Sequence, residues 1–433
     1  MNIFIPIETT HREMLYKTFF CHFLAKKGFK CFLGSKHNIN YLINNESDFL
    51  YLDKGYHLIQ SDKLYKKIKK NNGTIVSLDE EGAIDFVDGS TLQKRYSKNL
   101  FKNSATTFMW GVEQYNLVKK NFYNSNKVFI TGHPRFELLK SNYHFLYKRE
   151  AKEINERFGK FNLINTNMGF GNNILGDEFV IRNYKERYKK IKNIIKSDKA
   201  KLDLMVGFAL KLAESSNRNI IFRPHPEENQ NYYKKVFKDH RNIHVVYEGS
   251  VFPWILASEF LVHPDCTTAI ECLISGKMPL SLMPKNINQD FVTHLPLKAS
   301  TCFDSSDDLV SFILNEKVEK TVKNKLKTIN RFFSVELDSN ESIAQILLDL
   351  SIEKRIFPKK LSFKTRTGLK LKLIKSFIFP VRFSNELSKQ KLSGLDLDKI
   401  QLISKRIKKN QKDFDNIKIK KLNEFLYSFS SND

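Results

Sequence analysis

The apolar residues of the chain form short runs that alternate with longer amphipathic stretches. "NIFIPIE" has the alternation of a strand, "REMLYKTFFCHFLAKKG" has the spacing of an amphipathic helix that ends at Gly28, and "FKCFLG" follows as the next strand. Further apolar runs occur at "FLYLD", "GTIVSLDEEG", "TFMWG" and "KVFITGHPRF", with polar helical stretches between them. This order of elements predicts one parallel sheet with helices on both faces.

A second series of apolar runs begins at "FNLINTN". It continues through "NIIFRPHP", "IHVVYE", "EFLVHPDC" and "MPLSLMP", with "DLMVGFALKLAES" and "TTAIECLISG" as helices. We therefore predict a second open α/β sheet, with the boundary in the charged segment near residues 148 to 160. The predicted division is residues 1–155 for the first Rossmann-like domain, 156–345 for the second and 346–433 for a basic helical extension.

Composition limits the class of protein. The chain has 433 residues, of which 41% are hydrophobic, and this is ample for two packed cores. No stretch approaches the roughly 18 to 20 apolar residues of a membrane-spanning helix, and the N-terminus lacks the basic start of a signal peptide. The five cysteines are scattered without CxxC spacing, so we predict neither a disulfide framework nor a zinc site. These features predict a cytoplasmic protein.

The net charge of +25 is unevenly distributed. Lys greatly outnumbers Arg and occurs with many Asn and Ile, as AT-rich coding produces, and no RNP, zinc-finger or arginine-rich signature predicts nucleic-acid binding. Residues 353–433 hold 21 basic and 8 acidic residues, an excess of 13. The stretch "GLKLKLIKSFIFPVRF" interleaves Lys and Arg with apolar residues, which predicts association with the anionic inner-membrane surface. The alternative is a Lys-rich helical extension that packs on its own domain.

The stretch "NIIFRPHPEEN" ends a predicted strand on Arg223 and places His225 between two prolines. Each proline fixes its own φ and extends the residue before it, so the imidazole projects from a stiff loop. Ligands of open α/β sheets bind beyond the carboxyl ends of the strands. Arg223, His225 and Pro226 are therefore candidates for binding a phosphate. The alternative is a histidine that caps a helix beginning with Glu227 and Glu228.

Two further His-Pro pairs occur, at His133 and His263, so the dipeptide alone does not identify a site. The stretch "TGHPRFELL" closes the first predicted domain. For His133 and Arg135 a structural or interdomain role is an equal alternative to ligand binding. His263 ends a strand in "FLVHPDCTTAIE". The helix after it starts with unpaired N–H groups, which favours an anion.

The candidate residues of this helix start are one thiol, two hydroxyls and one carboxylate: Cys266, Thr267, Thr268 and Glu271. The hydroxyls suit a phosphate, and Glu271, one turn into the helix, is placed to reach ribose hydroxyls. The alternative is an ordinary threonine cap with a solvated glutamate.

Three adjacent carboxylates, Asp79, Glu80 and Glu81, precede Gly82 at the end of another strand. Their mutual repulsion tends to raise at least one pKa, as a general base requires, and a plain acidic loop is the alternative. "NTNMGFGNN" places Gly169 where backbone approaches a ligand, but it is not GxGxxG, so no dinucleotide cofactor is predicted. The DxD pattern "DLDK" at residues 396–399 lies in the predicted basic extension, so no metal is predicted.

These motifs together resemble bacterial sialyltransferases and Kdo transferases, which use CMP-activated sugars on a GT-B scaffold of two Rossmann-like domains facing a cleft. The resemblance implies that Glu80, before Glu81 and Gly82, is the catalytic base. It also implies that His225 contacts the CMP phosphate. Thr267 and Thr268 correspond to the Ser/Thr pair of these families.

The segments "IFIPIETTHRE", "LINTN", "TGHPRF" and "RPHPEEN" also resemble the group of surface carbohydrate biosynthesis proteins, over roughly residues 1 to 345. This resemblance implies a donor and acceptor cleft lined by Thr10, Arg12, Asn165, Asn167 and Gly169. "RPHP" with a hydroxyl pair at a helix start is also similar to CDP-glycerol glycerophosphotransferases, whose leaving group is again CMP.

The resulting hypothesis is a glycosyltransferase that moves a Kdo-like or nonulosonic acid from a CMP-sugar to a surface glycan such as lipopolysaccharide or capsule. Glu80 acts on the acceptor hydroxyl, with Glu81 as a competing base, while Arg223 and His225 neutralise the departing phosphate without a metal or a further cofactor. Three alternatives stay open: a CDP-glycerol glycerophosphotransferase, a sugar-nucleotide 2-epimerase, and a non-catalytic membrane-binding or nucleic-acid-binding protein on a GT-B fold.

Overall fold

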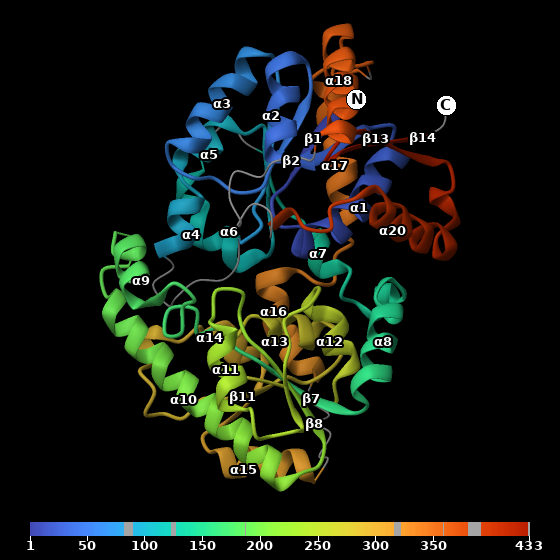
Figure 1. Ribbon diagram of the computed structural model, residues 1–433. Coiled ribbons are helices and arrows are strands. Elements are labelled where there is room, and N and C mark those ends of the chain that lie inside the picture. Colours follow the sequence, from blue (N-terminus) through green and yellow to red (C-terminus); the bar gives the residue numbers. More distant parts are fainter. Residues whose placement is uncertain are drawn as a thin grey trace. The chain divides into compact units, whose positions relative to one another are not determined.

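The computed structural model describes residues 1–81, 90–122, 127–186, 188–315, 322–357, 359–379 and 391–431. Contacts between residues divide this part of the chain into two units. Unit 1 comprises the described parts of Met1–Ala83, Thr91–Leu138 and Arg331–Asp433, and unit 2 those of Ile84–Ser90 and Leu139–Asn330. Figure 1 shows both units, each built on its own sheet.

Unit 1 contains an eight-stranded sheet in the order β13-β14-β2-β1-β3-β4-β5-β6. The strands from β1 to β6 are parallel to one another. The chain passes from β1 to β2 on one side and returns to β3 on the other, so the strand order reverses between β1 and β3. The six parallel strands are β1 (Asn2–Ile7), β2 (Lys30–Ser35), β3 (Leu50–Asp53), β4 (Thr74–Leu78), β5 (Thr106–Met109) and β6 (Lys127–Ile130).

Helices connect these strands, as the alternation of apolar and amphipathic stretches predicted. The first helix ends as expected, because Gly28 has a φ of 83° that only glycine adopts without strain. The helices are α1 (Thr10–Lys26), α2 (Lys36–Asn45), α3 (Gln60–Lys70), α4 (Ser90–Arg95), α5 (Lys98–Asn103), α6 (Val112–Val118) and α7 (Pro134–Glu137).

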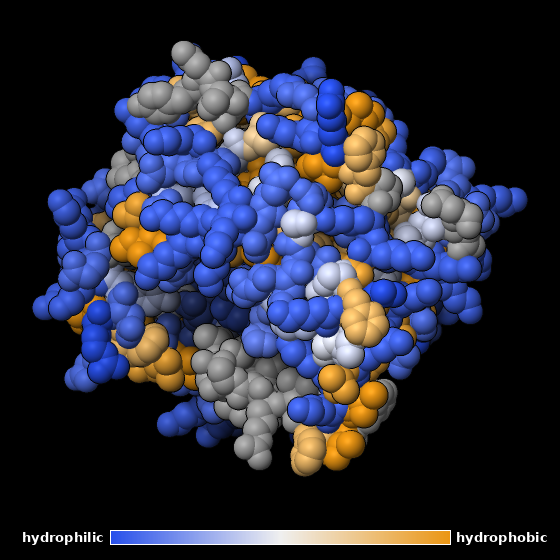
Figure 2. All heavy atoms as spheres, turned by 90° about the horizontal axis from the view of Figure 1, so that it is seen from above, coloured by the Kyte–Doolittle hydropathy of each residue, from blue (hydrophilic) through white to orange (hydrophobic). Residues whose placement is uncertain are grey.

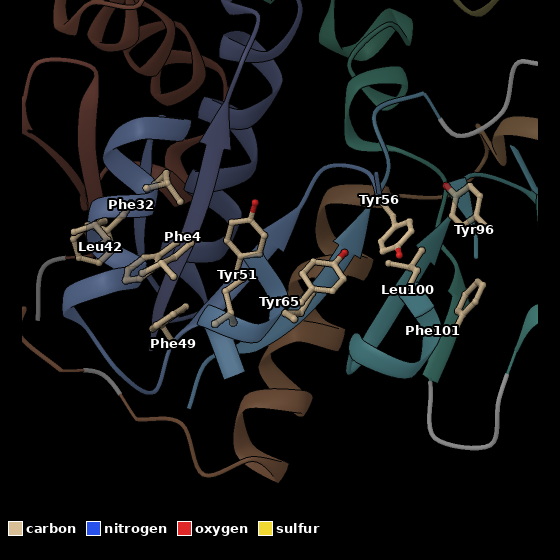
Figure 3. Close-up of a cluster of buried hydrophobic side chains, with 14 of the residues drawn as sticks. Phe4, Phe32, Leu42, Phe49, Tyr51, Tyr56, Tyr65, Tyr96, Leu100 and Phe101 are labelled. Carbon is tan, nitrogen blue, oxygen red and sulfur yellow. The ribbon is translucent and has the colours of Figure 1, made fainter. Parts of the chain in front are cut away.

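Aromatic residues form much of the core of unit 1. The Phe4 ring stacks on Phe49 with ring centroids 4.5 Å apart and meets Phe32 edge to face at 5.5 Å. Figure 3 shows these side chains together with Leu42 between the sheet and its helices. All four are fully buried, so this cluster fixes α2 and the loop before β3 against the sheet.

The C-terminal segment belongs to unit 1, and the prediction of a separate helical extension from residue 346 is wrong in this respect. It contains α17 (Ser339–Glu353), α18 (Phe363–Ile378) and α20 (Leu397–Asn410), followed by the antiparallel strands β13 (Ile417–Asn423) and β14 (Leu426–Ser431). Strand β14 pairs antiparallel with β2 and so extends the first sheet. A Cβ at Gly34 would lie 2.5 Å from the carbonyl oxygen of Phe425, so this pairing requires glycine.

Unit 2 contains a six-stranded parallel sheet in the order β12-β11-β10-β7-β8-β9. The chain runs outward from β7 to β9, returns to the centre, and runs outward again from β10 to β12. This is the Rossmann order, with its reversal between β7 and β10. The strands are β7 (Phe161–Asn165), β8 (Asn219–Arg223), β9 (Ile243–Val245), β10 (Leu261–His263), β11 (Leu280–Leu282) and β12 (Thr301–Phe303).

The helices of unit 2 begin earlier than the predicted boundary at residue 155. Tyr147, at the start of the first of them, meets Phe252 of α12 edge to face at 4.6 Å, which attaches the charged segment to unit 2. The helices are α8 (Lys148–Phe158), α9 (Gly176–Tyr184), α10 (Ile191–Ser215), α11 (Gln230–Val236), α12 (Val251–Ala257), α13 (Thr268–Ile274), α14 (His294–Ala299), α15 (Ser306–Leu314) and α16 (Val322–Phe333), the last of which continues into unit 1. Within the described ranges, no helix is both long enough and apolar enough to cross a membrane.

Candidate functional site

The point where the strand order of unit 2 reverses is the candidate nucleotide site. Two loops start there, one after β7 at Asn165 and one after β10 at His263. In open α/β sheets the loops that leave neighbouring strands in opposite directions separate and form a crevice for ligands. The sequence placed Asn165, Asn167, Gly169, Thr267 and Thr268 on these two loops, and the structure brings them to the same edge of the sheet.

Two hydrogen bonds join these loops. The Asn165 side chain donates to the Thr268 hydroxyl at 3.0 Å, and the Asn167 side chain donates to the Asp265 carboxylate at 2.9 Å. The amide oxygens of both asparagines are buried and have no hydrogen-bond partner among the described residues. Because a buried, unpaired acceptor costs about 1–3 kcal/mol, these two oxygens are suited to accept hydrogen bonds from a bound molecule.

Buried Glu228 holds the loop after β8 against the loop after β7. Its carboxylate accepts hydrogen bonds from the backbone N–H groups of Met168 and His225, at 2.9 and 3.2 Å, and from the hydroxyls of Thr166 and Tyr233. Burial raises the pKa of Glu228 to about 7, although these hydrogen bonds oppose the rise. The alternative interpretation, a histidine that caps a helix with Glu227 and Glu228 in its first turn, does not hold, because α11 begins only at Gln230.

His225 is exposed on this loop, as the two prolines predicted. Its Nδ1 accepts a hydrogen bond from the backbone N–H of Glu227 at 3.3 Å, so the neutral imidazole carries its proton on Nε2. A Cβ at Gly169 would lie 3.3 Å from the same Nδ1. Gly169 therefore lets the loop after β7 lie directly against the imidazole. Pro226 is likewise exposed.

Arg223, a candidate for binding a phosphate, is buried at the end of β8. Its two terminal nitrogens donate to the carbonyl oxygens of Glu248 and Gly249 at 2.9 and 2.8 Å, and its guanidinium lies over the rings of Tyr247 and Trp254. Burial lowers its pKa to about 10. In this structure Arg223 fixes the loop between β9 and α12, and the sequence could not show this because the partners are backbone atoms 25 residues away.

The helix after β10 starts at Thr268, but it has only seven residues. Thr267 is its exposed N-terminal cap residue and its side chain makes no capping hydrogen bond, whereas the Thr268 hydroxyl donates to the Cys266 thiol at 3.3 Å. Burial raises the pKa of the Cys266 thiol to about 11, so it is not a nucleophile. Glu271 lies in the first turn, as predicted.

A buried charge cluster that the sequence did not reveal supports the two loops. Lys201 of α10 pairs with Asp198 at 2.9 Å and with Asp265 at 3.4 Å. Burial acts to lower the pKa of Lys201, but Asp265 and Asp198 raise it, so the ammonium stays charged. Asp198 also accepts a hydrogen bond from the backbone N–H of Phe170 in the loop after β7. Because Asp265 belongs to the loop after β10, the cluster holds both loops of the site.

In unit 1, Glu80 is deeply buried after β4. Its carboxylate pairs with Lys17 at 2.9 Å and accepts a hydrogen bond from Tyr16, and its other oxygen lies 3.9 Å from Nε2 of His133. Burial opposes ionisation, yet the Lys17 ammonium holds the pKa of Glu80 well below its usual range. A carboxylate so strongly stabilised in its charged form is a weak proton acceptor, which argues against the role inferred for Glu80 by resemblance.

Glu81 has a different environment. Its side chain is 54% exposed and forms ion pairs with Arg95 at 3.2 Å and Arg12 at 3.5 Å, while Asp79 is buried against Arg95. The expected repulsion among the three carboxylates is therefore relieved by cations, Arg95 for Asp79 and Glu81 and Lys17 for Glu80. Gly82, which completes the motif, lies outside the described residues.

Several buried polar atoms near Glu80 have no hydrogen-bond partner in the part of the chain that the structure describes. They are the Thr10 hydroxyl, Nε of Arg12, Nε of Arg135, Nε2 of His133 and one oxygen of Glu80. Burial lowers the pKa of His133 to about 3, so this imidazole stays neutral. Thr10 and Arg12, predicted to line a donor and acceptor cleft, lie in the first turn of α1. His133, directly before α7, faces Glu80, and Arg135 lies within α7.

No protein-family model matches the chain, and no curated protein matches it. Among solved structures, a UDP-GlcNAc 2-epimerase from Methanocaldococcus jannaschii aligns with a TM-score of 0.50 at 13% identity, over 80% of this chain and 99% of that one. The UDP-GlcNAc 2-epimerase from Neisseria meningitidis bound to UDP-GlcNAc has a TM-score of 0.48 at 12% identity, with coverages of 81% and 100%. The wall teichoic acid polymerase TagF has 0.45 at 12%, with coverages of 82% and 88%.

At 13% identity, the similarity to the Methanocaldococcus jannaschii epimerase shows the fold alone. The predicted fold class is confirmed: the protein is α/β with two parallel-sheet Rossmann-like units, a fold of the GT-B and epimerase type.

Proposed function

We propose that unit 2 binds the nucleotide of a cytidine-activated donor and that the protein is a transferase in the synthesis of a surface glycan. The observation that carries this proposal is the reversal of strand order between β7 and β10, with the buried, unpaired amide oxygens of Asn165 and Asn167 at that edge. Exposed His225 supplies an N–H donor for a phosphate, and exposed Thr267 supplies a hydroxyl. The cytidine base is inferred from the resemblance of these motifs to families whose leaving group is CMP.

Two donors fit the proposal. In the first, a CMP-activated Kdo-like or nonulosonic acid is transferred, the anomeric bond to phosphate breaks, and a base accepts the proton of the acceptor hydroxyl. Glu81 is the better-placed carboxylate for this step, because Glu80 is buried and firmly ionised.

In the second, an acceptor hydroxyl attacks the glycerol-bearing phosphorus of CDP-glycerol and CMP again leaves. This reaction is mainly a matter of positioning and charge stabilisation, so it makes a smaller demand on a carboxylate base. The burial of Glu80 favours this candidate. TagF, which was solved with CDPG, is a wall teichoic acid polymerase, so the proposal places this chain near the same kind of chemistry.

The test is a donor screen with the full chain. CMP-Kdo, CMP-sialic acid, CDP-glycerol and UDP-GlcNAc are each incubated with protein and a mixture of glycan acceptors, and released CMP, released UDP and epimerised sugar are separated by chromatography. We expect CMP from one of the cytidine donors and a thermal stabilisation by CMP that exceeds the effect of UDP. Epimerisation of UDP-GlcNAc without CMP release would replace the proposal with the epimerase alternative, and no preference for any nucleotide would overturn it.

The matched variants are His225→Ala and His37→Ala, both at exposed histidines, the second on α2 of unit 1. Loss of one charge-assisted hydrogen bond to phosphate at His225 is worth about 1.5–3 kcal/mol, or roughly a 10-fold to 150-fold weaker CMP affinity. The His37 variant should bind CMP like the native chain.

A further inference from the structure

Helix α18 exposes an apolar stripe of four large side chains, which the exposed Thr367 interrupts near its start. Phe363, Leu371, Ile374 and Ile378 are 78%, 55%, 56% and 65% exposed. At about 100° per residue these four positions fall within an arc of roughly 80° on one side of the helix. In the view of Figure 2 the surface is mainly hydrophilic, and apolar residues form only small clusters. A stripe along four turns of one helix is therefore an unusual feature of this surface.

The opposite side of α18 is packed on unit 1, so the stripe is held outward. Thr365 and Leu369 are buried, a Cβ at Gly368 would collide with the Tyr41 hydroxyl, and the Lys372 ammonium lies 3.5 Å from the centroid of the Tyr41 ring. Figure 1 shows α18 beside α2, which carries Tyr41. The predicted extension thus does pack on its own domain, but with only one of its faces.

The start of α18 is fixed as well. The Ser362 side chain caps the helix by accepting from the backbone N–H of Thr365, and its hydroxyl donates to Glu46 at 2.8 Å. The orientation of the helix is therefore set by unit 1 before any partner binds, which lowers the entropic cost of using the outward face.

Basic residues border the stripe on both sides. By helical position, Lys364 and Lys375 flank one edge and Arg366 and Lys370 flank the other, and α18 contains no acidic residue. A partner protein that matched this pattern would need an apolar strip bordered on both sides by acidic residues. An anionic lipid surface matches it directly, because acyl chains accept the apolar stripe and headgroups accept the flanking charges.

We propose that α18 lies in the plane of an anionic membrane and attaches unit 1 to it through Phe363, Leu371, Ile374 and Ile378. Each flanking basic residue contributes electrostatic attraction that decreases with salt, and the apolar residues insert at the boundary of headgroups and acyl chains. This surface is independent of the proposed reaction and stands even if the donor is a different nucleotide.

The experiment is vesicle sedimentation of the full chain. Vesicles of phosphatidylcholine with about 30% phosphatidylglycerol are compared with pure phosphatidylcholine, at low and high salt. We expect binding to the anionic vesicles that weakens with salt. The double variant Leu371→Glu/Ile374→Glu should reduce the partition coefficient by at least about tenfold, because two inserted apolar groups become charged.

The matched control is Leu314→Glu, which places a glutamate at a 44%-exposed leucine on α15 of unit 2 and should leave binding unchanged. Thermal unfolding of each variant confirms that it is folded. Lys364→Gln/Lys375→Gln should weaken binding to the anionic vesicles and remove part of its salt dependence. Absence of native binding to anionic vesicles, equal binding by the Leu371/Ile374 variant, or a stripe-dependent dimer in place of vesicle binding would each overturn the proposal.

Discussion

Replacing Glu228 by Gln is expected to remove one component of the pH dependence of stability while keeping the loops after β7 and β8 in place. Glu228 has a pKa of about 7 in the folded protein because of burial, against 4.5 for an ordinary glutamate. The folded state therefore binds the extra proton between these values. Its contribution to stability is fully present below about pH 4.5 and is lost as the pH rises through 7.

The size of this effect follows from the two pKa values. A rise from 4.5 to about 7 corresponds to about 3 kcal/mol in total, of which about 2.5 kcal/mol is lost between pH 5 and pH 8. Gln resembles the protonated carboxyl and does not titrate. The Gln variant should accordingly gain about 2.5 kcal/mol relative to the native chain between pH 5 and pH 8, measured by urea unfolding.

The chain has two tryptophans, Trp110 in unit 1 and Trp254 in unit 2, so variants in which one of them is replaced by phenylalanine report each unit separately by fluorescence. The matched control is Asp53→Asn, since burial also raises the pKa of Asp53 to about 7, but in unit 1. Glu228→Gln should change the pH dependence seen by Trp254, and Asp53→Asn should change that seen by Trp110. An unchanged pH dependence of unit 2 in the Gln variant would refute the raised pKa.

Glu228→Ala separates the hydrogen bonds from the charge. It leaves the backbone N–H groups of Met168 and His225 buried without a carboxylate acceptor, at about 1–3 kcal/mol each. We expect unit 2 to lose about 2–5 kcal/mol and to lose nucleotide affinity, because both loops of the site depend on this residue. Native stability in the Ala variant would refute its role as the link between the loops.

Three further predictions test other parts of the description. Glu80→Gln should destabilise unit 1 by about 3–5 kcal/mol in urea unfolding, because Lys17 loses a buried partner. Glu81→Gln should leave stability unchanged and, if Glu81 is the base, should lower turnover by roughly 10²–10⁴. Arg223→Lys should lower the free energy of unfolding by about 1–3 kcal/mol, with CMP affinity retained; weaker CMP binding at unchanged stability would instead favour a phosphate contact. Gly34→Ala should cost about 1–3 kcal/mol by separating β14 from β2, seen as faster hydrogen exchange in residues 426–431.

The order of strands and helices was predictable because buried parallel strands and amphipathic helices have different apolar periods. "NIFIPIE" and "NIIFRPHP" are both strands where the pattern placed them, and the helix between β1 and β2 ends at Gly28. The two C-terminal strands were missed although "IKIKKLN" alternates with the period of a strand. Its lysines favoured a solvated extension, although the edge strand of a sheet also carries lysines on its solvent face.

The candidate site was predictable only in part. Asn165 ends β7, and Gly169, His225 and Thr268 lie within five residues after the ends of β7, β8 and β10, so the carboxyl-end rule finds them. The structure brings them to one edge of unit 2. Lys201 could not be found this way. It lies within α10, and its partner Asp265 is 64 residues further along the chain. A buried, paired lysine of this kind can be distinguished from a surface lysine only once the fold is known.

The acidic stretch after β4 shows why local spacing does not assign a base. Three neighbouring carboxylates differ little in sequence, but consecutive residues after a strand point in different directions and meet different partners. Asp79 meets Arg95, Glu80 meets Lys17, and Glu81 stays largely in solvent. The residue whose position matches the base of the CMP-sugar families is thus buried and held in its charged form by Lys17. Under the proposal, a CMP-sugar transferase would use Glu81 for that step, whereas transfer of a glycerol phosphate makes a smaller demand on a carboxylate base. A large loss of turnover in Glu81→Gln therefore favours the CMP-sugar donor, and a small loss favours CDP-glycerol.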